Sequence, residues 1–296
     1  MMSNANRYVF SIAGVVIQLQ TDQTLQMEEA FQDFLIENQQ SDVNVSFFET
    51  NNLPELSGEI LHQSKYYQIH IGENGEELCG FIDETRDKIP YAVRTVDEQC
   101  ENIRICYLKK GTRCVSEFRN SFAHLDIETI MLRRNRLCFH ASCVHTDFGG
   151  ILFSGESGIG KSTQADLWCK YRNAVQINGD RPILSLDDEE KWFAWGSPYA
   201  GSSLCHVNQK SPIRAIFMLK QSDTCQVRRL SMPEAFKAVW QGITIHNWNK
   251  TFVERASELV MNLISSIPVY EYACTPDEQA VLFLEGKLRE EGNNHE

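Results

Sequence analysis

The chain has 296 residues, of which 42% are hydrophobic and 23% charged, and its formal net charge is −12. This length permits one large domain or two ordinary ones, and the hydrophobic fraction suffices for a packed core, which argues against a disordered protein. The acidic balance argues against a nucleic-acid partner, because binding to nucleic-acid phosphates requires an excess of Lys and Arg. Any anionic ligand must therefore be bound by a local site that outweighs the overall charge.

The sequence carries no pattern of a secretion signal or a membrane span. It lacks a basic stretch followed by an apolar run near the N-terminus, and no apolar run approaches the roughly 20 residues that cross a bilayer. The ten cysteines are scattered, without a Cys-x-x-Cys pair or a Cys/His cluster at zinc spacing. We therefore expect a cytoplasmic protein with reduced thiols and without a membrane partner.

Residues 1–125 are expected to form an N-terminal β-rich α+β domain. Short segments of alternating apolar and polar residues predict strands, and residues 27–37 have apolar side chains at helical spacing. This region contains no chemical motif, so we expect a scaffold or a module for substrate or partner recognition. The predicted strands are residues 8–13, 15–19, 43–48, 67–71, 78–82 and 103–108.

Residues 126–296 predict an α/β domain. A helix is expected over residues 127–137, and a strand over residues 149–154 leads through a glycine-rich loop into a helix over residues 162–170. Strands and helices continue to the end of the chain. The later strands are expected at residues 175–177, 183–186, 191–195 and 213–219, and the later helices at residues 233–241, 251–264 and 276–291.

The motif Gly-x-x-x-x-Gly-Lys-Ser lies between the predicted strand and helix. Glycines allow successive backbone N–H groups to point at phosphate oxygens, and the start of the helix adds its positive dipole end. Lys161 supplies a charge for the β- and γ-phosphates, and the Ser162 hydroxyl can bind magnesium. The sequence therefore predicts a site for ATP and Mg²⁺ formed by Gly155, Glu156, Ser157, Gly158, Ile159, Gly160, Lys161, Ser162 and Thr163.

Asp180 follows the next predicted strand. Ligands of open α/β sheets lie at the carboxyl ends of the strands, so we expect the Asp180 carboxylate to face the same crevice as the loop. There it can bind Mg²⁺ or accept the proton of an attacking hydroxyl. The alternative is an ordinary turn residue after Asn178-Gly179.

The segment from His140 to Arg181 resembles the catalytic domain of the HPr kinase/phosphorylase family and its looser relatives, some of them encoded with lasso-peptide pathways. The shared features are a His before a strand, the loop Gly-Glu-Ser-Gly-Ile-Gly-Lys-Ser at residues 155–162, and a strand that ends in Asn-Gly-Asp-Arg at residues 178–181. The resemblance implies a P-loop kinase fold of the PEP carboxykinase type and ATP–Mg²⁺ as phosphoryl donor. It also implies a hydroxyl acceptor, typically Ser of a protein or peptide, and a homo-oligomer.

The resemblance further implies that His140 lies near the reacting phosphate, with Lys161 and Asp180 as the other catalytic residues. An imidazole titrates near neutral pH, so His140 can assist proton transfer or donate a hydrogen bond to the γ-phosphate. The alternative is that His140 is a structural residue at the start of a strand, with its hydrogen bonds made to the backbone.

The chain departs from the family pattern at three places. Gly179 replaces the first of two paired aspartates, Thr163 replaces a Glu, and a glycine-serine loop at residues 195–203 replaces the signature Glu-x-Arg-Gly-x-Gly. These departures argue against phosphorylase activity and against HPr as substrate, and they leave the kinase interpretation with a single acid, Asp180. The loop at residues 195–203 either closes over the nucleotide or the acceptor, or is a long surface turn.

The sequence favours a kinase that transfers the γ-phosphoryl group of ATP to a hydroxyl of a serine-containing protein or peptide, or of a small molecule. Two alternatives stay open. Gly179 favours a nucleotide-binding recognition or regulatory module with weak or no kinase activity. Hydrolysis of ATP or GTP is the other, although the guanine-recognition motif Asn-Lys-x-Asp is absent from the sequence.

Overall fold

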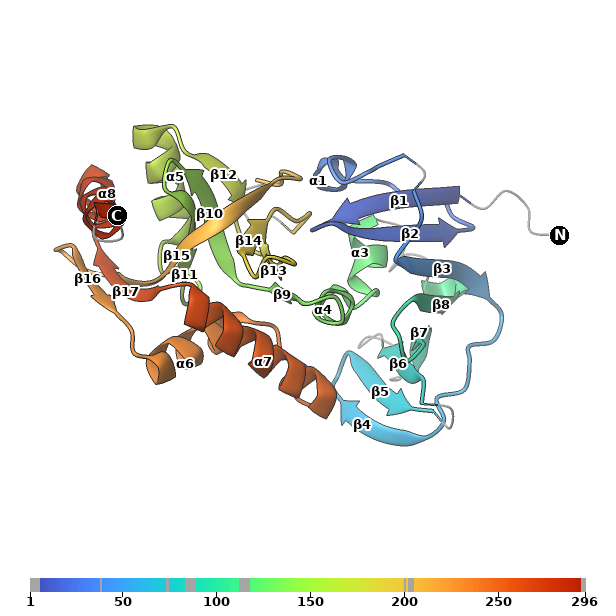
Figure 1. Cartoon of the computed structure of the whole chain (residues 1–296). Helices are drawn as coiled ribbons and strands as arrows, with labels where there is room; N and C mark the ends of the chain where they lie inside the picture. The colour runs from blue at the N-terminus through green and yellow to red at the C-terminus, as the bar shows by residue number, and fades with distance from the viewer. Residues whose placement is uncertain are drawn as a thin grey trace. The chain divides into compact units, whose positions relative to one another are not determined.

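The chain divides into two compact units, each with its own β-sheet, so the architecture is mixed α/β (Figure 1). The first unit comprises residues 1–134 and 246–252, and the second comprises residues 135–245 and 253–296. The domain boundary expected after residue 125 stays a prediction. The computed structural model describes residues 6–37, 39–72, 75–82, 89–111, 118–199, 201 and 205–293.

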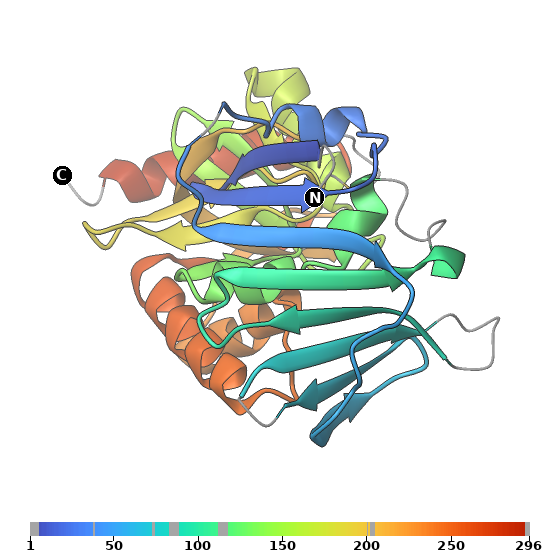
Figure 2. The ribbon, with the colours of Figure 1, turned by 90° about the vertical axis from the view of Figure 1, so that its right-hand side faces the viewer.

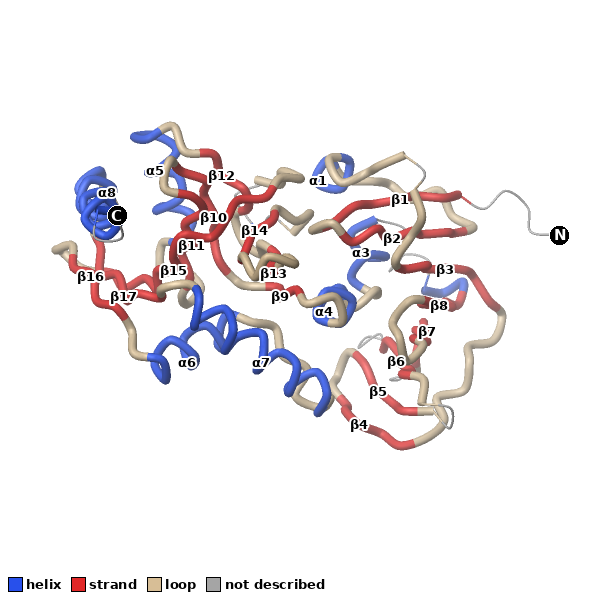
Figure 3. The backbone as a smooth tube through the Cα atoms, viewed as in Figure 1, coloured by secondary structure: helices blue, strands red, loops and turns tan. Residues whose placement is uncertain are grey.

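The first unit is built on an eight-stranded sheet, and strands dominate it in Figure 3. The strands run in the order β1-β2-β3-β8-β7-β6-β5-β4, with β3 parallel to both of its neighbours and the other pairs antiparallel. The strands are β1 (Asn6–Ile12), β2 (Val15–Thr21), β3 (Val43–Thr50), β4 (Glu59–Gln63), β5 (Tyr67–Ile71), β6 (Glu77–Ile82), β7 (Pro90–Val96) and β8 (Asn102–Leu108).

Helices cover one face of this sheet, and Figure 2 looks onto the opposite face. Aromatic rings fill the covered side, where Phe122 packs edge to face against Phe10 and Phe31 at centroid distances of 5.9 and 5.1 Å. All three side chains are buried. The short helical elements are α1 (Glu29–Gln32), η1 (Lys109–Gly111), α3 (Phe118–Ala123) and α4 (Ile127–Leu132).

A buried arginine lies on the covered side of the sheet. The Arg94 guanidinium, 5% exposed, forms ion pairs with Glu77 at 2.8 Å and Asp126 at 3.2 Å. One Arg94 nitrogen also donates to the backbone carbonyl of His124. Burial is the largest single effect on Arg94, and by itself it lowers the pKa. The charges around the guanidinium, among them the Asp126 and Glu77 carboxylates, together outweigh burial, so the pKa of Arg94 is raised.

Two helices predicted from the sequence are shorter in the structure. The helix expected over residues 27–37 is limited to α1, because the next residues pair with the edge of β1 through hydrogen bonds from Ser11 N–H to Phe34 O and from Ile36 N–H to Val9 O. The helix expected over residues 127–137 ends with α4. Asn135 then adopts a left-handed conformation (φ 60°), and the chain enters strand β9 (Arg136–Cys138).

The second unit contains a mixed sheet in the order β12-β10-β11-β15-β14-β13-β9, with β17 pairing with β15 and β16. Strands β11, β15 and β17 are parallel, which brings their carboxyl ends to one edge. The strands after β9 are β10 (Ala141–Thr146), β11 (Gly149–Ser154), β12 (Val175–Asn178), β13 (Ile183–Leu186), β14 (Trp192–Trp195), β15 (Lys210–Gln221), β16 (Gln226–Arg229) and β17 (Val269–Cys274).

The remaining helices confirm the helical segments predicted for the second half of the chain. They are α5 (Lys161–Arg172), α6 (Met232–Gly242), α7 (Lys250–Ser266) and α8 (Glu278–Asn293). The core of the second unit joins α5 and α8 to the central strands, with Trp168 of α5, Phe153 of β11 and Leu284 of α8 all fully buried. This packing fixes the start of α5 against the end of β11. No helix among the described residues is long and apolar enough to cross a membrane.

Arg94→Met should lower the free energy of unfolding by about 3–5 kcal/mol, because it leaves two carboxylates without their cation in a buried position. Arg104→Met, on the adjacent strand but with an exposed side chain, should change it by less than about 0.5 kcal/mol. Urea denaturation followed by circular dichroism gives both values. Similar losses in the two variants would contradict the structural role of Arg94.

Candidate functional site

The predicted phosphate-binding loop connects the end of β11 to the start of α5. Gly158 and Gly160 have φ angles of +80° and +112°, a conformation that side chains disfavour, although a Cβ atom would meet nothing within 4 Å at either position. Backbone conformation therefore explains these glycines. Gly160 is the N-cap residue and has no side chain to cap the helix, which leaves the first N–H groups of α5 available to an anion.

Lys161 bends back over this loop. Its ammonium donates hydrogen bonds to the carbonyl oxygens of Gly155 and Glu156, both at 3.0 Å. Only 9% of the residue is exposed. Burial lowers the pKa of Lys161, and the nearby Asp180 carboxylate opposes this effect. The loop carbonyls thus hold the charge at the helix start, where a phosphate oxygen can replace them.

His140 and Asp180 form a pair beside the loop. The distance from His140 Nε2 to Asp180 Oδ1 is 3.2 Å, and the side chains are 41% and 33% exposed. Burial lowers the pKa of His140, the Lys161 charge lowers it further, and the Asp180 carboxylate opposes both. These effects together favour the neutral form of the imidazole at pH 7.

Backbone hydrogen bonds fix His140 between three segments of the second unit. Its N–H donates to Gly242 O at 2.7 Å, and its carbonyl accepts from the Ser154 hydroxyl at 2.8 Å. The next residue, Ala141, donates its N–H to Asp180 O at 3.0 Å. The end of β11, the start of β10 and the Asp180 turn are therefore joined directly.

A buried amide that the sequence prediction did not include sets the Asp180 turn. Asn178 Oδ1 accepts from the N–H groups of Asp180 at 2.9 Å and Arg181 at 2.7 Å, and Asn178 Nδ2 donates to Ser197 O at 3.0 Å. The Ser197 hydroxyl donates to Arg181 O at 2.6 Å. An Asn two residues before the candidate acid is a sequence signal for such a turn, but its buried bond to Ser197 requires the fold.

Gly201 lies against the candidate carboxylate. It has a φ of +59°, and a Cβ atom at this position would be 2.7 Å from Asp180 Cβ and 2.9 Å from Asp180 Cγ. Gly201 belongs to the glycine-serine loop that was expected either to close over a ligand or to form a surface turn. Residues 200, 202 and 203 of that loop lie outside the described part of the chain, so both alternatives stay predictions.

The other predicted ligands lie along the loop and the first turn of α5. Glu156, Ser157 and Thr163 are exposed, Ser162 is half-buried, and Ile159 is partly buried against the core. Ser162 and Asp180 offer one hydroxyl and one carboxylate, and Mg²⁺ in phosphoryl-transfer sites is typically held by one or two carboxylates together with substrate phosphates. This donor set fits a magnesium ion that arrives with a nucleotide.

A pocket of about 530 Å³ adjoins the loop on the side of Thr163 and Gln164. Gln164 is 3% exposed, and its Nε2 donates to Thr275 O at 2.9 Å, which links α5 to the end of β17. The residues after β15 and β17 complete the pocket. It thus lies at the carboxyl ends of parallel strands, the usual position of ligands in α/β sheets.

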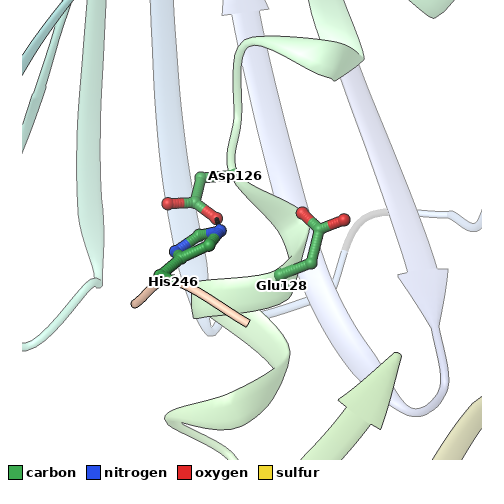
Figure 4. Close-up of side chains that lie close together, drawn as sticks. All are labelled: Asp126, Glu128 and His246. Atoms are coloured by element: carbon green, nitrogen blue, oxygen red, sulfur yellow. Dashed lines mark ion pairs between the residues drawn. The ribbon is translucent and has the colours of Figure 1, made fainter. Parts of the chain in front are cut away.

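The first unit contains a separate acidic and imidazole cluster, drawn in Figure 4. Ligand atoms of Asp126, Glu128 and His246 all lie within 4.8 Å of one another. The Asp126 carboxylate is already paired with the buried Arg94, and its distance to His246 Nε2 is 3.6 Å. The His246 ring stacks on Trp248 at 4.7 Å. These contacts explain the cluster as an anchor for residues 246–252.

NMR titration of His140 tests the geometry of the pair. We expect a pKa below the ordinary value of 6.5, and His140→Gln identifies the resonance. Lys161→Met should raise this pKa because it removes a repelling charge. Asp180→Asn should lower it further because it removes the carboxylate that stabilises the imidazolium. Identical values in the two variants would contradict the arrangement.

Gly201→Ala should displace the Asp180 side chain, because the new methyl group requires its space. We expect shifted His140 resonances and a free energy of unfolding lowered by about 1–3 kcal/mol. Gly286→Ala is the matched control, since its position in α8 is open and φ is not in the left-handed region. It should leave His140 unchanged and raise stability by up to about 1 kcal/mol; an equal response of His140 in both variants would refute the contact.

Comparison with known proteins gives little beyond this geometry. No family model matches the chain, and no curated protein matches it. A solved structure described as the Hpr(Ser) kinase/phosphatase from Coxiella burnetii is similar over 53% of this chain and 94% of its own, with 14% sequence identity and a TM-score of 0.31. A likeness at this level carries no argument about family or function.

Proposed function

We propose that the chain is a kinase that uses ATP with Mg²⁺ and transfers the γ-phosphoryl group to a hydroxyl of a serine-containing protein or peptide, or of a small molecule. The observation that carries the proposal is the His140–Asp180 pair, which is joined through Ser154 to the loop that holds Lys161 at the uncapped start of α5. A cation and free N–H groups suit a phosphate, and a carboxylate beside them suits the acceptor hydroxyl. Phosphoryl transfer depends mainly on such positioning and charge stabilisation.

The donor nucleotide would bind through the loop and α5. Lys161 would exchange its two loop carbonyls for β- and γ-phosphate oxygens, while the N–H groups of residues 155–163 contact the remaining oxygens. The 530 Å³ pocket beside Thr163 and Gln164 offers room for the ribose and the base. The local positive charge overcomes the net charge of −12 at short range.

The acceptor hydroxyl would be oriented by Asp180, with neutral His140 hydrogen-bonded to the same carboxylate. As the oxygen forms its bond to the γ-phosphorus and the bond to the β-phosphate oxygen breaks, the hydroxyl proton passes to the Asp180–His140 pair, and ADP leaves. Magnesium, bound through Ser162 and Asp180, would neutralise charge on the phosphoryl oxygens. Gly201 would leave the space that keeps the carboxylate in this position.

One observation favours a nucleotide-binding regulatory module with weak or no kinase activity instead. Gly179 leaves the turn with the single carboxylate of Asp180, which would have to serve both as a magnesium ligand and in proton transfer. The two functions differ in whether a phosphoryl group reaches an acceptor, since both require nucleotide binding.

Nucleotide binding tests the donor half of the proposal. By calorimetry with Mg²⁺, Lys161→Ala should weaken ATP binding at least about tenfold, because charge-assisted hydrogen bonds to phosphate are lost. His140→Ala should have a much smaller effect. Equal effects of the two substitutions would contradict their roles, and absence of binding to the wild-type protein would refute both proposed functions.

Label transfer tests the acceptor half. Protein, labelled ATP and Mg²⁺ are incubated with serine-containing peptides and with small hydroxyl compounds, and transferred label is measured. Asp180→Asn should reduce the transfer rate at least about a hundredfold. Asp188→Asn, which alters an exposed acid in the turn after β13, should leave it unchanged. Tight ATP binding without transfer to any acceptor would favour the regulatory module.

A further inference from the structure

The face of the first unit's sheet that carries no helix is turned toward the viewer in Figure 2. Polar residues line a cavity on this face. Pairs of polar residues alternate with buried ones on β2 (Gln18, Gln20), β3 (Asn44, Ser46) and β8 (Asn102, Arg104), and the strand register aligns them in transverse rows. One row crosses five strands through Gln20, Ser46, Arg104, Thr95 and Leu78. The row beside it runs through Gln18, Asn44 and Asn102 and continues with Asp97 and Glu76, just beyond the ends of β7 and β6.

These rows form the floor of a cavity of about 600 Å³, which lies within the size range of small-molecule sites. Pro54, Glu55 and Ser57 of the connection between β3 and β4 form a wall. The same connection covers β6, where a Cβ atom on Gly80 would lie 2.5 Å from Leu56 Cδ1. The polar surface is therefore a bounded groove.

Arg104 is the cation of this groove. Its side chain is exposed, and within the described ranges it makes no hydrogen bond or ion pair. Its neighbours in the row, Ser46 and Thr95, are neutral. The guanidinium is thus available to form a bidentate contact with a ligand carboxylate.

The negative charge of the groove lies at Asp97, in the row that runs through Gln18, Asn44 and Asn102. Asp97 Oδ2 accepts from Asn102 Nδ2 at 2.7 Å, and Asp97 Oδ1 accepts from the N–H of Glu101 at 2.8 Å. Burial by itself would raise the pKa of Asp97, but these hydrogen bonds outweigh it and lower the pKa. The carboxylate is therefore ionised and fixed, and Glu76 lies beside it in the groove.

The two opposite charges line the same groove without pairing with each other. Arg104 is opposite Thr95, and Asp97 lies two residues farther along the chain, just beyond the end of β7. Both side chains line the cavity, and they form no ion pair within 4.0 Å. An α-amino acid carries one carboxylate and one ammonium, so it can form an ionic hydrogen bond with each of these two groups.

We propose that the groove binds a free α-amino acid, with its carboxylate on Arg104 and its ammonium on Asp97 and Glu76. The side-chain amides of Gln18, Gln20 and Asn44 both donate and accept hydrogen bonds and line the remaining floor, so an amino acid with a polar side chain fits best. This site is formed by the first unit's own strands, and its occupation does not depend on the nucleotide site.

Ligand-detected NMR and calorimetry on the full-length protein, without nucleotide, test this proposal with the twenty common amino acids added singly at up to roughly 10 mM. At least one should bind. For the tightest binder, the N-acetylated and the carboxamide forms should each bind at least about tenfold more weakly, because each removes one charge. A tripeptide with that residue at its centre should also bind more weakly, since its termini are farther apart.

Arg104→Gln should weaken binding of the tightest amino acid at least about tenfold, and Glu76→Gln should weaken it to a smaller extent. Arg119→Gln is the matched control, because Arg119 is an exposed arginine of the same unit on α3. It should bind as the wild type does. No binding of any amino acid, unchanged binding to Arg104→Gln, or tripeptide binding as tight as that of the amino acid would overturn the proposal. ATP titration of the same variants separates this outcome from a failure of the nucleotide site.

Discussion

The candidate site depends on one buried side-chain amide. Asn178 is fully buried, and its oxygen and nitrogen together hold the N–H groups of Asp180 and Arg181 and the backbone of Ser197. A buried amide with satisfied hydrogen bonds has essentially one stable orientation, because any rotation leaves polar atoms unpaired. The position of the Asp180 carboxylate, and through it the environment of His140, follows from this constraint.

The positive charge of the candidate site comes from one lysine, Lys161, and not from the overall charge of the chain. Lys161 is partly desolvated among carbonyl oxygens, and its charge lowers the pKa of His140. A phosphate that entered this site would meet a cation already stripped of most of its water, so the interaction would be stronger than at an exposed lysine. An acidic protein can bind an anion in this way without changing its overall composition.

The sequence predicted those parts of the fold that local pattern determines. The strand at residues 149–154, the glycine-rich loop and the helix after it were expected and are observed, because apolar periodicity and glycine positions act over a few residues. The helix expected over residues 27–37 was too long, since pairing with β1 outweighs local preference there. Strand β10, which follows His140, was expected only from the family resemblance, because its residues are buried among neighbouring strands and show no clear alternation.

For the candidate site, sequence motifs named the loop, Lys161, His140 and Asp180, and the structure pairs His140 with Asp180 beside the loop that holds Lys161. Their roles stay predictions. Asn178 and Gly201 could not be assigned from the sequence, because their importance comes from contacts across the fold with Ser197 and Asp180. Register across five strands likewise defines the polar groove, and register is a property of the folded sheet.

The path of the chain between the two units has a practical consequence. Residues 246–252 belong to the first unit, although more than a hundred residues of the second unit precede them. In this segment Trp248 stacks on His62, and His246 approaches Asp126. A gene fragment that stops near residue 134 would therefore encode the first sheet without the aromatic segment that packs on it. Neither unit corresponds to one uninterrupted stretch of coding sequence, so dissecting this protein requires a bridging linker or co-expressed pieces rather than simple truncation.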